Sequence, residues 1–210
     1  MQTRTYADLY DLIQALCGVT FATIEEARIR ALVNRRASKA YKASNYWTRF
    51  LLIGEEVLIN GDTILYSDPT SGEEIDTFLR IYKTQPYLSS SVQEYEFVVT
   101  SLGARLVGYT SEEATGTAYA TAKTQLLDKY GNGSGYTQNV PAEWFEYLAH
   151  GTYADYLRAE GQQEKAALAD QEANEILLDE LMKLDEQHTQ TIISNRISTN
   201  ANMQYRNSRY

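Results

Sequence analysis

The segment from Pro141 to Leu184 constrains the fold of this chain most strongly. Its large apolar residues between Trp144 and Leu157 recur at steps of one, three and four, the spacing of one helical face. Gly161 then predicts the end of this helix, because glycine adopts the left-handed closing conformation most easily. A second amphipathic pattern runs on to Leu184, so the pair predicts an antiparallel helical hairpin. Neither helix can bury its apolar face alone, and the hairpin must therefore pack on helices of this chain or of a neighbouring chain.

Three further helices are predicted outside the hairpin. Apolar spacing favours a short helix from Tyr6 to Leu16. A longer one begins at Thr23, where Glu26 completes a capping box, and runs to about Ser44. Ser111 opens another, reaching about Leu127, with alanines on one face that allow close packing. We expect residues 1–45 and 111–186 to form one helical bundle.

Residues 46–110 follow a period of two, which is typical of strands. Asn60-Gly61 lies between two apolar runs, and this dipeptide is a strong hairpin signal because both residues tolerate positive φ. This segment predicts a small antiparallel sheet whose free edges neighbouring subunits could cover. The expected fold class is α+β, mainly α: a helical bundle with an inserted small antiparallel β-sheet and an extended C-terminal arm.

The predicted arm, residues 187–210, differs from the rest of the chain in charge and composition. The net charge of the whole is −9, but no Asp or Glu follows Glu186, so the arm carries +3 and the preceding chain −12. The arm is rich in Thr, Ser, Asn and Gln with scattered apolar residues, a composition typical of a segment that orders on a partner. The 17 tyrosines of the chain favour subunit contacts. The acidic body argues against general DNA affinity.

The sequence predicts no catalytic residue, metal site or cofactor, and no enzyme. It contains no phosphate-binding loop, dinucleotide fingerprint or nucleophile elbow. Glu143, Glu146 and His150 are the nearest approach to a metal site, which would require further ligands. Cys17 lies in an apolar setting typical of an inert thiol in a reducing compartment, and no signal peptide or membrane span is expected. The competing hypothesis of a Glu146/His150 metalloenzyme predicts stoichiometric metal.

The helix from Arg28 to Lys42 is basic, with no acidic residue between Ala27 and Gly54. One interpretation is a nucleic-acid-binding regulatory protein that uses this helix, and it predicts DNA affinity that falls steeply with salt. The other is that these cations form salt bridges with acidic helices and neighbouring subunits, which the net charge favours.

Two stretches resemble a known family. The Ala/Arg-rich segment from Glu25 through Trp47, and the segment Pro-Ala-Glu-Trp-Phe-Glu-Tyr-Leu-Ala-His-Gly-Thr-Tyr-Ala-Asp-Tyr-Leu at 141–157 with its partner helix, are similar to the head-to-tail adaptor (connector) proteins of tailed bacteriophages. Within that family the chain resembles the tail tubular protein A group of short-tailed phages.

This resemblance implies a virion protein of the neck or tail, assembled in the bacterial host cytoplasm. It implies a homo-oligomeric ring, usually of twelve copies, that joins the portal protein to tail or nozzle proteins. Genomic DNA would pass through the ring without specific binding, and no membrane is involved. We expect the portal-binding arm to use Ile192, Ile193, Arg196, Ile197, Met203, Tyr205, Arg206, Arg209 and Tyr210. We expect the subunit interface to use Arg28, Arg35, Lys39, Trp144, Tyr147, Tyr153 and Tyr156.

Overall fold

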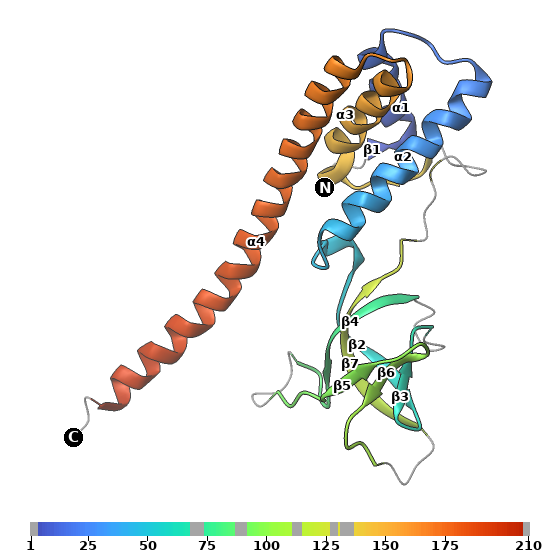
Figure 1. Cartoon of the computed structure of the whole chain (residues 1–210). Coiled ribbons are helices and arrows are strands. Elements are labelled where there is room, and N and C mark those ends of the chain that lie inside the picture. The colour runs from blue at the N-terminus through green and yellow to red at the C-terminus, as the bar shows by residue number, and fades with distance from the viewer. Residues whose placement is uncertain are drawn as a thin grey trace. The chain divides into compact units, whose positions relative to one another are not determined.

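The chain folds into two compact units in a computed structural model (Figure 1). Unit 1 comprises Met1–Ser44 and Asp128–Tyr210, and unit 2 comprises Asn45–Leu127. The structure describes residues 4–67, 74–86, 92–110, 115–126, 130 and 137–207, with the backbone alone at 115 and 187–207.

Unit 1 is built from four helices and one short strand pair. The helices are α1 (Tyr6–Cys17), α2 (Thr23–Ala43), α3 (Ala142–Ala159) and α4 (Gln163–Asn207). Strands β1 (Arg4–Thr5) and β8 (Asn139–Val140) pair in antiparallel fashion. Helix α3 packs against α1, α2 and α4, so it is the central element of the unit. Its side chains Trp144, Tyr147 and Leu148 are fully buried there.

The ends of these helices follow from local chemistry. The predicted hairpin is confirmed: α3 ends at Ala159, Gly161 has a φ of 81°, and α4 begins two residues later. At α1, the Thr5 hydroxyl accepts a hydrogen bond from the Asp8 amide, and the Asp8 carboxylate accepts one from the Thr5 amide. This capping box satisfies two amide groups that the first helical turn leaves without partners.

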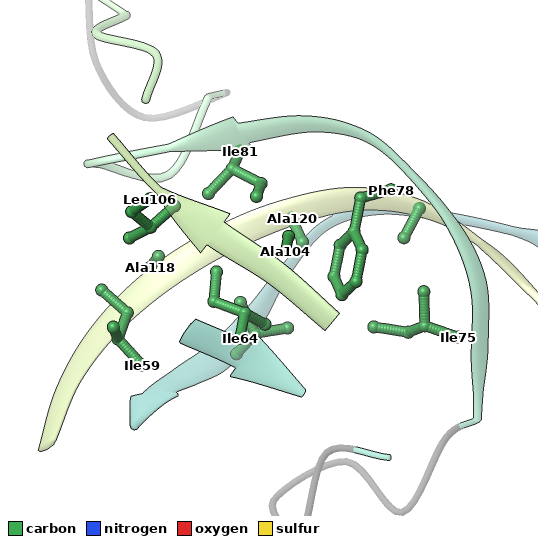
Figure 2. Packing of buried hydrophobic residues seen from close by; sticks show 11 residues of the cluster. Ile59, Ile64, Ile75, Phe78, Ile81, Ala104, Leu106, Ala118 and Ala120 are labelled. Atoms are coloured by element: carbon green, nitrogen blue, oxygen red, sulfur yellow. The ribbon is translucent and has the colours of Figure 1, made fainter. Parts of the chain in front are cut away.

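Unit 2 is a six-stranded antiparallel sheet with the order β4-β7-β2-β3-β6-β5. Its strands are β2 (Leu51–Asn60), β3 (Thr63–Leu65), β4 (Ile75–Tyr82), β5 (Phe97–Val99), β6 (Gly103–Leu106) and β7 (Thr115–Thr124), preceded by the 3-10 turn η1 (Thr48–Phe50). The predicted hairpin at Asn60-Gly61 is confirmed, since it joins β2 to β3. Figure 2 shows side chains from separate strands, including Ile64, Phe78 and Ile81, pointing toward a common interior.

The sheet closes on itself over part of its length. Tyr82 forms a bridge with Glu94, and the Tyr95 amide donates to the Ile81 carbonyl, so the chain before β5 pairs with the end of β4. The result is a nearly closed barrel. Register shifts at Ile75/Thr77 and Phe78/Arg80 distort the rest of β4.

The outer edge of β5 stays open beyond this closure. The Val107 amide donates to Glu96 and the Thr100 amide to Gly103. Val98 lies two residues from both Glu96 and Thr100, so its backbone groups also point toward β6. The backbone groups of Phe97 and Val99 point away from β6. No strand of the described residues pairs with β5 on that side.

The expected mainly helical bundle with a small inserted sheet is wrong, because the β strands form a barrel-like unit of their own. The helix predicted from Ser111 to Leu127 is instead β7 over its described part. Ala118, Ala120 and Ala122 are all buried on the barrel side, a period of two that a helix cannot produce. The β insertion thus extends to Leu127 rather than ending near residue 110.

The extended C-terminal arm is likewise corrected, because the backbone of residues 187–207 continues α4 as helix. Between Gln163 and Asn207 there is neither glycine nor proline, so no backbone signal ends the helix at Gln187.

Candidate interaction surfaces

The most tightly organised polar site is a buried ion-pair cluster in unit 1. Arg36 of α2 and Asp155 of α3 expose 4% and 3% of their side chains. The Arg36 Nε and Nη2 atoms each lie 2.8 Å from a separate oxygen of Asp155, a bidentate pair. Arg36 Nη2 also lies 2.7 Å from Oδ1 of Asp170 on α4. One guanidinium thereby ties three helices together.

Two further arginines surround the same carboxylates. Arg35 Nη2 and Arg158 Nη1 approach Oδ1 of Asp155 at 3.1 and 2.9 Å. Burial lowers the pKa of Arg36, but its hydrogen bonds to Asp155 and Asp170 outweigh this effect, so the pKa lies above its ordinary value. Burial raises the pKa of Asp170, yet the Arg36 hydrogen bond and the nearby positive charges bring it below its ordinary value. Arg36 and Asp170 are therefore both charged at neutral pH.

Gly151 provides the space for this arrangement. A Cβ atom at Gly151 would lie 3.0 Å from Arg36 Cδ and 3.1 Å from Nε, closer than most real contacts. The cluster is a structural junction, because the buried charges of Arg36 and Asp155 compensate each other inside the fold and Asp170 joins them to α4.

The basic residues predicted as a subunit interface lie on the exposed side of α2 and at its margins. Arg28 lies 3.7 Å from Glu160, Arg35 contacts Asp155, and Lys39 Nζ lies 3.4 Å from Asn174 Oδ1. These contacts are the intramolecular salt bridges and hydrogen bonds that the acidic helices favour. They also reduce the positive charge that this helix would offer to nucleic acid.

The four aromatic residues of the same prediction lie in two environments. Trp144 and Tyr147 are fully buried inside unit 1, so contacts with another subunit would require other side chains. Tyr153 and Tyr156 are half-buried, and the Tyr156 ring meets Phe21 edge-on at 5.5 Å between centroids. The structure therefore divides the predicted set between the core and the surface.

The predicted portal-binding residues lie at the C-terminal end of α4. The helical backbone includes Ile192, Ile193, Arg196, Ile197, Met203, Tyr205 and Arg206, whose side chains lie outside the described part of the structure. Arg209 and Tyr210 lie outside the described residues altogether.

The residues examined for metal or nucleophilic chemistry have other partners. Glu146 accepts a hydrogen bond from Arg4 at 2.9 Å, and His150 Nδ1 lies 3.3 Å from Glu172. Within the described ranges, no group of three His, Cys, Asp or Glu residues could hold a metal ion. Burial raises the pKa of Cys17 to about 11, so its thiol is protonated at neutral pH. None of the helices that the structure describes is long and apolar enough to cross a membrane.

Exposed apolar side chains form two groups that the sequence patterns did not indicate. On α4, Leu168, Leu178 and Met182 are exposed on the side opposite Ala169 and Ala173, which are buried. On the barrel, the β5–β6 hairpin and the residue after it expose Val98, Val99, Leu102 and Val107. The α4 side chains share one helical face, which is typical of protein–protein contacts, whereas Val98 and Val99 are consecutive in β5 and point to opposite sides of the strand.

The described residues thus define an α+β chain with a helical unit, a barrel-like unit and exposed apolar side chains on both. No protein-family model matches the sequence, and no curated protein matches it either.

Proposed function

We propose that this protein is a structural virion component, a head-to-tail adaptor that forms a ring between the portal and the tail or nozzle proteins of a tailed bacteriophage. The ring, of about twelve copies by the family resemblance, forms part of the channel through which DNA is retained and ejected.

The observation that carries this proposal is the length of α4. Helix α3 has 18 residues and α4 has 45, so they span about 27 and about 68 Å at 1.5 Å per residue. Helix α3 can cover less than half of α4. A helix that continues so far beyond its supporting partner offers a surface to another protein, because a helix within a protein gains most of its stability from tertiary packing.

Charge distribution supports the same function. The cationic segment 187–210 suits an acidic surface on a portal, while the remaining chain carries −12 and would repel DNA that passes through the ring. The buried position of Arg36 and the ion pairs of Arg35 reduce the case for a DNA-binding regulator.

Electron microscopy tests the proposal directly. The full chain and a variant ending at Glu186 are each mixed with purified portal rings from the genome that encodes this chain. We expect an added ring of density with the full chain and none with the truncated variant. Helical content by circular dichroism and tryptophan fluorescence would show that the truncated variant keeps the core of unit 1.

The outcomes separate the parts of the proposal. Undiminished portal binding by the truncated variant would refute the role of residues 187–210. Absence of the full chain from portal rings would refute the adaptor function. Tight, salt-sensitive binding of free duplex DNA would favour the regulatory alternative instead.

A further inference from the structure

Helices α2 and α4 present complementary outward faces in unit 1. The α4 outer face contains Leu168, Leu178 and Met182, whose spacing of ten and four residues confines them to about a quarter of the helix circumference. Helix α3 packs against both helices, on their opposite, buried sides. The α4 outer face is therefore not used within the packing of unit 1.

The α4 outer face is acidic as well as apolar. Four exposed carboxylates share this face between Gln163 and Glu186, and no lysine or arginine occurs at its positions within that range. They are Glu164, Glu175, Asp179 and Glu186.

The α2 outer face has the opposite character. Ile24 is 85% exposed, and Arg28 and Arg35 follow it at helical spacing with exposed or half-exposed side chains. Lys42 continues the same side, no acidic residue occurs at its positions, and the small Ala31 lies between the arginines. Small side chains allow a second helix to approach closely.

The two faces also match in length. From Ile24 to Lys42 the α2 outer face spans about 27 Å, and from Leu168 to Met182 the apolar part of the α4 outer face spans about 21 Å. Each face has opposite charge to the other, so a face cannot pair favourably with its own copy. When each copy uses its α4 outer face for one neighbour and its α2 outer face for another, the contacts are head-to-tail, and such contacts generate rings or filaments.

We infer that the α4 outer face of one copy packs against the α2 outer face of the next copy. This contact rests on the proposed adaptor function for the closure of the ring. It extends that function by assigning the interface between neighbouring copies. The apolar side chains of Leu178, Met182 and Ile24 are buried in this contact. The flanking charges set the register and prevent a face from pairing with the same face of another copy.

Sedimentation velocity of the full chain tests the apolar part. We expect association that increases with concentration and decreases with salt, because exposed charges are screened. Leu178→Lys should weaken association by at least about tenfold, or about 1.4 kcal/mol. Val92→Lys in unit 2 is the control, since Leu178 and Val92 are 56% and 44% exposed and Val92 lies outside both exposed apolar groups, and it should leave association unchanged.

Charge reversal tests the pairing of unlike faces. One variant carries Arg28→Glu and Lys42→Glu, and the other carries Glu175→Lys and Asp179→Lys. The first variant alone should associate far more weakly, because its α2 outer face becomes net negative and meets the negative α4 outer face. The second variant alone should also associate far more weakly, because its α4 outer face no longer carries a net charge. An equimolar mixture should associate again, since the unchanged α4 outer face of the first variant meets the unchanged α2 outer face of the second. Circular dichroism and urea unfolding confirm that every variant is folded.

Several results would overturn the inference. The first is a wild-type chain that remains monomeric at every concentration. The second is an equal loss of association in Leu178→Lys and Val92→Lys, and the third is a mixture of reversed variants that fails to associate. A monomeric chain that portal rings still recruit would leave the adaptor function standing while refuting this interface.

Discussion

Asp155 is the residue whose replacement should destabilise unit 1 most clearly without changing side-chain size. Asp155→Asn removes the carboxylate that accepts hydrogen bonds from Arg35, Arg36 and Arg158, and leaves Asp170 as their only remaining acid in the cluster. Arg36 is 96% buried, so its charge cannot be solvated instead. Breaking a buried pair in this way costs about 3–5 kcal/mol. With a urea m-value of about 2 kcal/mol/M, the unfolding midpoint should fall by about 1.5–2.5 M.

Tryptophan fluorescence can follow each unit separately. Trp144 is buried in unit 1 and Trp47 in unit 2, so a Trp47→Phe background reports the unfolding of unit 1 alone. Glu146→Gln is the control, because it breaks an exposed ion pair with Arg4 that contributes about 1 kcal/mol at most. A midpoint shift for Asp155→Asn no larger than that of Glu146→Gln would refute the reasoning that the cluster holds the helices together.

Three further predictions concern other parts of the fold. Gly103→Ala should lower the free energy of unfolding of unit 2 by about 2 kcal/mol or more in urea, because the φ of Gly103 is 152° and a Cβ would overlap the Ile64 carbonyl. Gly61 also has a positive φ but lies in open space, so Gly61→Ala should lower that free energy by only about 1 kcal/mol. Thr5→Ala should lower the stability of unit 1 by about 1 kcal/mol through loss of the α1 cap, whereas Thr5→Ser should retain most of it in thermal unfolding. The folded pKa of Asp170 lies below its unfolded value of about 3.9, so the stabilisation by this carboxylate is present above that pH and is lost as the pH falls through the folded pKa. Asp170→Asn should therefore flatten the dependence of the urea unfolding midpoint on acid pH. An unchanged slope would contradict this role of Asp170.

Local signals predicted the helices and one hairpin well. Gly161 and the apolar spacing around Trp144 gave the α3–α4 pair, and Asn60-Gly61 gave the β2–β3 turn. These features depend on backbone conformations that neighbouring residues largely determine, so the sequence carries them directly.

Strand β7 shows where periodicity is ambiguous. Ala118 and Ala122 are four residues apart and fit a helical face, but with Ala120 they also fit one side of a strand. The alternating Thr117, Tyr119 and Thr121 favour a strand, since β-branched and aromatic residues are enriched there. The choice is settled by long-range pairing with β2 and β4, which no local pattern contains.

The ion-pair cluster was missed because its members are far apart in the sequence. Arg36 belongs to the basic run from Arg28 to Lys42, but it is next to the buried Ala37 and one turn before the buried Ala40. Asp155 lies between the buried residues Ala154 and Leu157 in the same way. A charged residue on an apolar helical face is the usable signal, because it requires an opposite charge in the core.

The outward backbone groups of Phe97 and Val99 have a consequence for the production of this protein. Strand β5 has no charge, proline or bulge between residues 97 and 99, and natural proteins use such features to prevent uncontrolled strand recruitment. Freshly synthesised copies should therefore aggregate through their barrels at high expression levels. A single gatekeeper charge, Val99→Lys, would keep such copies in solution while leaving the helices untouched.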